Sequence, residues 1–436
     1  MIDVNYFKER FEQNQATYQK DALADIRLEG FKTLSREGFP TLKNEEWKYT
    51  GISSLFNKDF QFNQDINQSS VNEADVEQAR LPGHTEANEL FFCDGTYKPQ
   101  LSTIRSKKLV IQSLQEAVAG EYQEIVKQSL GHSNKSITDG IHALNTSFIS
   151  SGTFIYIPQK TRIEHPLYIH HIMDARANPT FSQPRILIYA EEGSKIQIVE
   201  TYTSLGASGS FYNEVIEITV NEGAILEYYK IQNDTPNSNH VGTTHFWQKG
   251  RSYVHTLTLS LDGGMIRNNT NLILDAEGCE SHLYGLYLLK GRSHVDNHTL
   301  VDNRQPYCIS NELYKGILDD YSTGVFNGKI KVEPKAQKTN AYQSNKNLLL
   351  SDRASINTKP QLEIFADDVK CSHGCTVGTL DENALFYLRA RGIPPEYAKA
   401  LLLKAFSADI LSQIKPESIR QYAEKLISNR LSINEE

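Results

Sequence analysis

The chain has 436 residues and a formal net charge of -8, with 45 lysines and arginines against 53 aspartates and glutamates. This mild acidic excess argues against a protein that binds nucleic-acid phosphates or carries a polybasic membrane patch, and the length predicts two or three domains. No run of 18 apolar residues occurs, and the polar start MIDVNYFKERFEQ lacks the apolar core of a signal peptide. We therefore expect a soluble, cytoplasmic protein.

Residues 1–140 are expected to form a mostly helical N-terminal domain. Apolar residues recur at helical spacing from Phe7 to Leu34, and Gly38 ends this pattern. The stretch 61–75 is rich in Asn, Gln and Ser, a composition that predicts a flexible linker within this domain.

Three further features are expected in the N-terminal domain. Residues 38–56, with the sequence GFPTLKNEEWKYTGISSLF, are expected to form an ordered loop, because Trp47 and Tyr49 can anchor it to a core. A short strand is predicted around Leu90–Cys93, and a helix is predicted over about 114–130.

From about residue 141 to residue 380 the chain alternates apolar and polar residues and is rich in Tyr and Thr, which predicts strands. The segments RILIYAEEGSKIQIVE, VIEITVNEGAILEYYK and NLILDAEGCESHLYG share one layout of strand, Glu-Gly and strand. Four glycines follow each other at spacings of 30, 27 and 28 residues: Gly193, Gly223, Gly250 and Gly278. A period near ~28 residues is typical of stacked repeats, and glycine suits a sharp corner with positive φ. We therefore predict a β-solenoid core over 141–380, with an ordinary β-sandwich as the alternative.

Residues 381–436 are expected to form a C-terminal helical domain. Asp381 can cap the segment LDENALFYLRARG, Gly392 suits the position after its last turn, and Pro395 opens a longer helix. The longer helix carries an apolar stripe, which consists of Ala398, Leu401, Leu402, Ala405, Phe406 and Ile410. Such a stripe has to cover another surface.

Five cysteines are dispersed along the chain: Cys93, Cys279, Cys308, Cys371 and Cys375. An odd count without a targeting signal argues against a disulfide framework. Isolated cysteines usually pack as small hydrophobic residues, and we expect this for Cys93, Cys279 and Cys308.

The segment CSHGC, residues 371–375, is the main candidate for a metal site, because it places two thiols and an imidazole within five residues. Residues two apart in a strand share a face and lie about 6.6 Å apart, so Cys371 and His373 could present ligands to one ion. Cys375 would lie about ~13 Å from Cys371, unless Gly374 bends the chain. A zinc ion or a cluster iron usually has four ligands, so we expect another chain to supply the missing ones.

Two other histidine pairs are expected to be polar strand faces rather than metal sites. These are His170 with His171, and His294 with His298 in HVDNH. Neither pair carries the glutamate of a zincin motif, and His294 and His298 lie too far apart in a strand to chelate one ion. The sequence also contains no G-x-x-x-x-G-K-[ST], G-x-S-x-G or H-E-x-x-H motif, which excludes the commonest nucleotide-hydrolysing and catalytic-triad signatures.

The C-terminal third resembles a known protein family. The resemblance rests on HVDNHTLVDN, ISNELYKGILDDYSTGVFNGKIKVEPKAQKTNAYQSNKNLLLS, KPQLEIFADDVKCSHGCTVG and LFYLRARGIPPEYAKALLLKAF, which are similar to the SufB/SufD family of iron–sulfur cluster assembly scaffolds. It runs from about residue 30 to residue 430 and is strongest after residue 290. The segments CSHG and GFPTLKNEEWKYT resemble the SufD branch of the family rather than the SufB branch.

The resemblance implies a right-handed parallel β-helix flanked by helical domains, acting as a non-catalytic scaffold in the SUF system. It implies pairing with SufB through the β-helix, binding of the ATPase SufC by the C-terminal helices, and self-pairing as an option without SufB. In the family, the histidine at the position of His373 faces a SufB cysteine where the nascent cluster sits, with Cys371 beside it. No cofactor is therefore expected in the isolated chain, and Cys375 departs from the alanine expected there.

The apolar stripe and the resemblance together predict the SufC contact: Leu385, Phe386, Tyr387, Arg391, Pro394, Ala398, Leu401, Leu402 and Phe406. Two other classes of function stay open. A β-solenoid carbohydrate-active enzyme would show clustered acidic residues on one face and a secretion signal. A zinc-binding structural module would use Cys371, His373 and Cys375.

Overall fold

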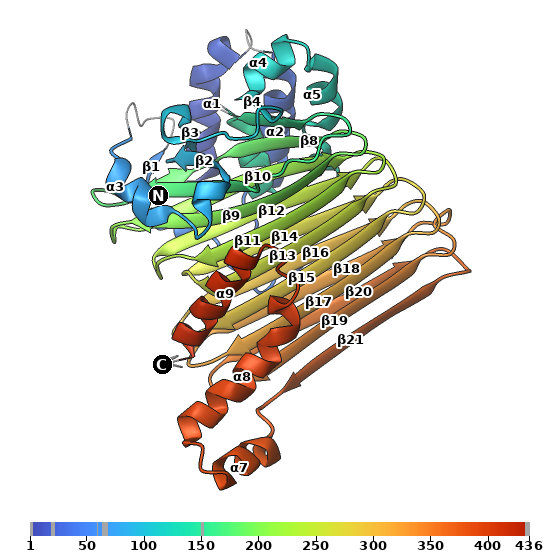
Figure 1. Cartoon of the computed structure of the whole chain (residues 1–436). Coiled ribbons are helices and arrows are strands. Elements are labelled where there is room, and N and C mark those ends of the chain that lie inside the picture. Colours follow the sequence, from blue (N-terminus) through green and yellow to red (C-terminus); the bar gives the residue numbers. More distant parts are fainter. Residues whose placement is uncertain (1–2, 19–21, 59, 63–68, 150–151, 432–436) are drawn as a thin grey trace.

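The computed structural model describes residues 3–18, 22–58, 60–62, 69–149 and 152–431. Within these residues the chain forms a long stack of strands, with one group of helices at its N-terminal end and a second group beside the later coils (Figure 1). The strands belong to two sheets, which we call sheet A, with 11 strands, and sheet B, with 10 strands.

The N-terminal part contains helices and short strands. Its helices are α1 (Val4–Tyr18), α2 (Ala24–Glu37), α3 (Glu73–Ala79), α4 (Leu114–Ala119), α5 (Gln123–Ser129) and α6 (Gly140–Ser147). Its strands are β1 (Gln61–Phe62), β2 (Asn88–Cys93), β3 (Thr96–Tyr97) and β4 (Val110–Ser113). The helical pattern before Gly38 and the strand near Cys93 are thus confirmed, whereas the single helix predicted over 114–130 is wrong, because the chain forms two helices there.

The segment 61–75, whose composition predicts a linker, contains β1 at its start and the first turn of α3 near its end. Residues 63–68 lie outside the described residues. Asn72 caps α3, since its side chain accepts two backbone N–H groups of the first turn. β2 pairs in parallel with β6, so sheet B begins within residues 1–140.

The solenoid strands alternate between the two sheets. In sheet A they are β5 (Thr153–Ile157), β7 (Thr180–Ser182), β8 (Arg185–Ala190), β10 (Ser210–Val220), β12 (Ser238–Gln248), β14 (Met265–Leu274), β16 (His294–Asn303), β18 (Thr323–Val332) and β20 (Ser355–Ile364). In sheet B they are β6 (Leu167–Asp174), β9 (Lys195–Leu205), β11 (Ile225–Asn233), β13 (Tyr253–Asp262), β15 (Glu280–Leu289), β17 (Ile309–Leu318), β19 (Asn340–Leu349) and β21 (Lys370–Gly378).

Each of these strands pairs in parallel with the strand of the same sheet in the next coil, which makes a β-solenoid of about eight turns. Equivalent residues of successive coils stack on one another inside it. Ile196, Leu226 and Val254 stack in register and are fully buried. One coil could not bury these side chains alone, so the stack forms one continuous core. The predicted solenoid is confirmed, and the sandwich, which is built from antiparallel sheets, is excluded.

The corner glycines follow the prediction at three of four positions. Gly193, Gly223 and Gly278 have φ of 65°, 67° and 70°, a region that favours glycine. The expectation is wrong for Gly250, which does not have a positive φ. A Cβ atom on Gly250 would lie 2.3 Å from the backbone nitrogen of Glu222, so close approach to the preceding coil requires glycine there.

The C-terminal helices are α7 (Glu382–Ala390), α8 (Pro395–Leu411) and α9 (Glu417–Arg430). Asp381 caps α7, and Gly392 follows it with a φ of 87°, as predicted. The helices α8 and α9 cover the outer face of sheet B, where Leu403 and Ile410 pack against strand residues such as Leu259. No helix within the described ranges is long and apolar enough to cross a membrane.

The apolar stripe predicted for α8 is partly wrong. The helix buries Ala398 and Ile410 as predicted, but it also buries Ala400 and Leu403, while Ala405 is exposed. The helix packs against sheet B and also against α7 and α9, so its buried positions are not confined to one stripe.

Candidate functional site

The last strand, β21, presents the residues of CSHGC in a row. Cys371, His373 and Cys375 are two residues apart, so their side chains lie on one face of the strand. They align in register with three buried residues of β19, which are Ala341, Gln343 and Asn345. Because side chains at paired positions of adjacent strands share a face, the three donors point toward the interior of the solenoid.

These interior-facing donors are nevertheless accessible, because among the described residues β21 pairs with β19 alone and no further coil covers it. Cys371 packs partly against the interior core, and burial raises the pKa of its thiol. His373 and Cys375 are exposed. The strand continues through Gly374 without a positive φ, so the bend that would bring Cys375 toward Cys371 is absent at that residue.

The Cys375 thiol lies 3.2 Å from the hydroxyl oxygen of Thr358 in β20, across the open end of the solenoid. Cys371 and His373 belong to no group of three or more potential metal-ligand side chains within the described residues. The segment therefore provides part of a ligand set, and a complete site requires donors from another molecule.

The last coil also exposes apolar and backbone groups. The strands β20 and β21 form the ends of sheets A and B. Ile364, Phe365 and Val377 on this coil are 39%, 58% and 48% exposed. An uncovered strand edge with apolar side chains is a template for pairing with another chain.

The predicted C-terminal contact residues divide into an outer and an inner group. The exposed residues are Phe386, Tyr387, Arg391 and Pro394, with Phe386 at 72% and Tyr387 at 58% exposed. The guanidinium of Arg391 lies 5.2 Å from the centre of the Tyr387 ring. The residues that are half-buried or buried are Leu385, Ala398, Leu401, Leu402 and Phe406.

Ala398 is fully buried, and Phe406 packs against the sheet cluster and so contributes to the attachment of α8 to the solenoid. By contrast, α7 buries no residue and projects beyond the sheet (Figure 1). The exposed part of the predicted contact is therefore concentrated on α7 and the turn that follows it.

The histidines of HVDNH contact the N-terminal loop rather than each other. His294 lies 2.9 Å from the hydroxyl of Thr50, and His298 lies 3.1 Å from Asp296 and 3.4 Å from Glu46. Histidine 298 and the nearby lysines hold the pKa of Glu46 at about 2, despite burial that raises it. These contacts attach the loop to the outer face of sheet A, in keeping with the expected polar strand face.

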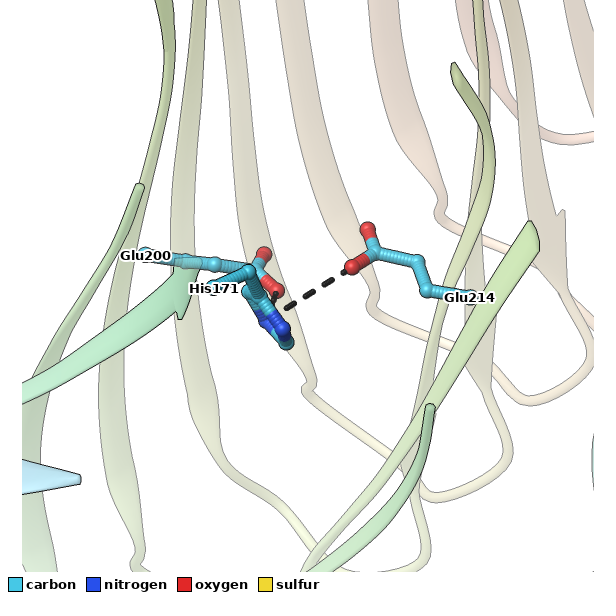
Figure 2. A group of neighbouring side chains, drawn as sticks. All are labelled: His171, Glu200 and Glu214. Carbon is cyan, nitrogen blue, oxygen red and sulfur yellow. Dashed lines mark hydrogen bonds and ion pairs between the residues drawn. The ribbon is translucent and has the colours of Figure 1, made fainter. Parts of the chain in front are cut away.

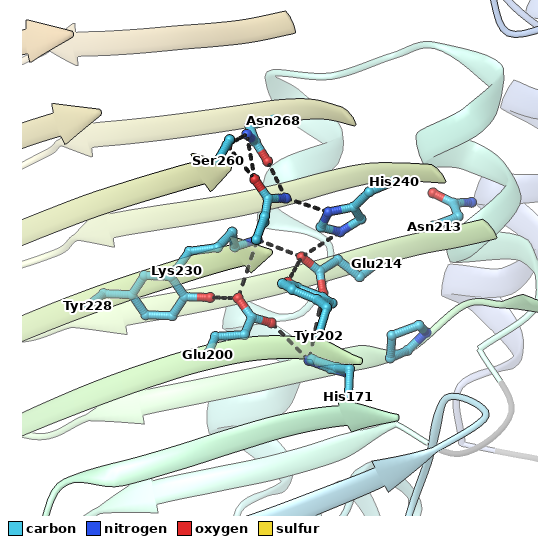
Figure 3. A network of polar contacts seen from close by, with 12 residues as sticks. His171, Glu200, Tyr202, Asn213, Glu214, Tyr228, Lys230, His240, Ser260 and Asn268 are labelled. Atoms are coloured by element: carbon cyan, nitrogen blue, oxygen red, sulfur yellow. Dashed lines mark hydrogen bonds and ion pairs between the residues drawn. The ribbon is translucent and has the colours of Figure 1, made fainter. Parts of the chain in front are cut away.

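Sequence reasoning missed a buried polar network inside the solenoid (Figure 3). Glu200, Glu214 and Lys230 lie at its centre, and Lys230 Nζ lies 3.3 Å from Glu200 Oε2 and 2.5 Å from Glu214 Oε1. Burial alone would raise the pKa of Glu214, but Lys230 and His240 hold it well below its usual range. Burial alone would lower the pKa of Lys230, but Glu200 and Glu214 raise it. Glu214 and Lys230 therefore form a buried ion pair in the core.

One signal in the sequence points to this network. Glu200 and Lys230 are separated by the same 30 residues as Gly193 and Gly223, and they pair in register. A stacked repeat places residues one period apart side by side, so opposite charges at that spacing indicate an ion pair. Glu214 comes from sheet A, and no repeat links it to the other two residues.

Comparison with known proteins agrees with this geometry. Residues 171–406 match the family model described as the SufBD core domain of SUF system FeS cluster assembly. Residues 3–169 match the model of the SufBD protein N-terminal region.

Two similar proteins span most of the chain. An iron–sulfur cluster assembly SufBD family protein of Synechocystis is 32% identical over 404 residues, covering 90% of this chain and 87% of that protein. The iron–sulfur cluster assembly protein SufD of Escherichia coli is 31% identical over 405 residues, covering 91% and 90%. The chain therefore belongs to the SufBD family of the SUF system for iron–sulfur cluster assembly.

Proposed function

We propose that the chain is a non-catalytic scaffold subunit of a cytoplasmic SUF complex, which pairs with SufB and binds the ATPase SufC. The nascent iron–sulfur cluster is cargo at the SufB interface, and ATP hydrolysis belongs to SufC. The observation that carries the proposal is the uncovered last coil, where His373 and Cys371 point toward the open end of the solenoid. Partial ligation on one chain suits a cluster that must be released to a client protein.

Pairing with SufB would use the free edges of β20 and β21. Backbone groups on a free strand edge can continue a sheet into a second solenoid, and the exposed Phe365 and Val377 would be buried in the contact. In the absence of SufB, the same edges could pair with a second copy of this chain. Such a junction places His373 within reach of SufB side chains.

In this proposal the imidazole of His373 is a ligand of the cluster. Cys371 is half-buried and lies beside the cluster, where it has a smaller role. Cys375 contributes nothing to ligation, because its thiol is turned toward Thr358. The zinc-binding module remains the competing function that uses the same residues. It predicts a colourless protein with bound zinc in place of a cluster chromophore.

The cluster proposal is tested by anaerobic co-purification of the chain with SufB and SufC, followed by measurement of iron and sulfide per complex. His373→Ala is expected to keep the complex together, since one exposed side chain contributes little to a solenoid core, and to lower cluster content several-fold. Cys371→Ala should have a smaller effect. Ser372→Ala, on the opposite face of the same strand, is the matched control. Full cluster content in His373→Ala would contradict the assignment.

SufC binding is assigned to the exposed face of α7 and the following turn. The double variant Phe386→Ser, Tyr387→Ser is expected to abolish co-purification with SufC while the solenoid stays folded, because both side chains are largely exposed and α7 buries no residue. Tyr321→Ser, an aromatic residue 49% exposed on the solenoid, is the control. Deletion of 381–436 is a poorer test, because it would also uncover the apolar outer face of sheet B. Undiminished SufC binding by the double variant would refute the docking site.

A further inference from the structure

Three potential metal ligands converge inside the early coils of the solenoid, far along the chain from CSHGC. His171, Glu200 and Glu214 come from β6, β9 and β10, and each is at most 2% exposed. Figure 2 shows the imidazole of His171 close to the carboxylate of Glu200, with the carboxylate of Glu214 facing it from the other side of the interior. Its Nε2 atom lies 2.9 Å from Glu200 Oε1 and 3.7 Å from Glu214 Oε2, and the three ligand atoms lie within 4.8 Å of one another.

The two carboxylates are held from the side opposite His171. Glu200 Oε2 accepts a hydrogen bond from the Tyr228 hydroxyl and forms an ion pair with Lys230. Glu214 Oε1 accepts hydrogen bonds from Tyr202 and Lys230, and a third contact comes from His240 at 3.1 Å. One oxygen of each carboxylate is thus fixed by neighbours, and the other is turned toward His171.

The free oxygen of Glu214 is the second observation that points to a ligand. Glu214 Oε2 is fully buried and has no hydrogen-bond partner among the described residues. A buried carboxylate oxygen without a partner raises the free energy of the folded protein, because it has given up hydrogen bonds to water and has formed none in their place. A cation between His171, Glu200 and Glu214 would satisfy it.

The spacing of the three atoms suits a small cation. Bonds of about 2.0–2.2 Å from a cation to nitrogen and oxygen place two neighbouring ligands roughly 3.0–3.6 Å apart. The distances of 2.9 and 3.7 Å from His171 Nε2 bracket that range. One imidazole with two carboxylates is a mixed nitrogen and oxygen set, which suits Fe²⁺ or Zn²⁺ rather than Ca²⁺.

The charges of the buried side chains also favour a bound cation. Lys230 neutralises one of the two carboxylates, which leaves one negative charge in the dry interior. A cation bound beside His171 would balance it. We propose that His171, Glu200 and Glu214 bind one divalent transition-metal ion inside the solenoid. This site is independent of the cluster cargo proposed for β21.

The test measures metal in the full chain. The untagged protein is produced in medium supplemented with Zn²⁺ in one arm and Fe²⁺ in the other, purified anaerobically and dialysed against EDTA in the folded state. Metal held by the exposed donors of β21 should be removed, whereas a buried ion should resist the chelator and leave only on unfolding. We expect about one metal ion per chain in at least one arm. Less than about one tenth would overturn the proposal.

Variants assign the retained metal to the site. His171→Gln and Glu214→Gln should each lose it. His170→Gln is the matched control, because His170 is the adjacent residue, is equally buried and faces Glu89 instead. Retention of the metal by His171→Gln would overturn the proposal. Should the variants not fold, X-ray absorption of the zinc-loaded parent decides, since sulfur ligands would place the ion on cysteine and refute the site.

Discussion

Glu312 in β17 allows a test of how burial in the solenoid interior changes the pKa of a carboxyl group and the stability of the fold. Its side chain points inward, is 4% exposed and accepts a hydrogen bond of 2.8 Å from Gln343. Burial raises the pKa of Glu312 from 4.5 to about 7, against the smaller effects of Thr299 and Gln343, and no cation contributes. The folded protein therefore favours the protonated carboxyl group.

The direction of the pH dependence follows from this shift. Since Glu312 binds its proton more tightly in the folded state, stability is full below about pH 4.5 and is lost as the pH rises toward 7. At 1.36 kcal/mol per pKa unit, a shift from 4.5 to about 7 corresponds to at most about 3 kcal/mol. Glu312→Gln keeps the shape of the side chain and its hydrogen bond with Gln343 but cannot ionise. The variant should therefore not lose this stability as the pH rises.

The assay is urea unfolding followed by far-UV circular dichroism at about pH 5 and pH 8. The stability of Glu312→Gln relative to the parent should increase by about 2–3 kcal/mol between the two pH values. Glu382→Gln, which alters an exposed carboxylate at the start of α7, should change by less than about 0.5 kcal/mol. An equal effect of Glu312→Gln at both pH values would refute the reasoning, because it would mean that Glu312 titrates alike in the folded and unfolded states.

Three further predictions concern packing and thiol access. Gly250→Ala should lower the melting temperature more than Gly378→Ala, because an added Cβ meets backbone at Gly250, whereas at Gly378 it meets nothing within 4 Å and φ is not positive; equal effects in thermal unfolding would contradict the close-approach argument. Leu403→Ala should cost about 2–4 kcal/mol in urea unfolding, because it leaves a cavity between α8 and sheet B, and a loss below about 1 kcal/mol would show that α8 is only loosely attached. In mass-spectrometric alkylation of the folded chain, Cys375 should react quickly and Cys93, whose pKa burial raises to about 12, should stay unmodified; rapid labelling of Cys93 would be inconsistent with its burial.

The sequence by itself determined the solenoid and the ends of its C-terminal helices. Glycines one repeat apart, such as Gly193 and Gly223, mark equivalent corners, and a stack of equivalent corners is the arrangement that buries the apolar face of every coil. The start and the end of α7 could also be predicted from the sequence, because Asp381 and Gly392 act on backbone groups a few residues away. These are local effects, so they can be predicted without knowing what lies across the fold.

The tertiary structure alone decided which side chains meet from different sheets. The spacing of Glu200 and Lys230 reveals their contact, because both lie in sheet B one coil apart. No spacing places Glu214 of sheet A opposite them, because the contact across the interior depends on the bend between the sheets. Likewise, CSHGC indicates ligands, but only the end of the coil stack explains why His373 faces inward and is still exposed. A residue at the same position in an earlier coil would be buried by the next one.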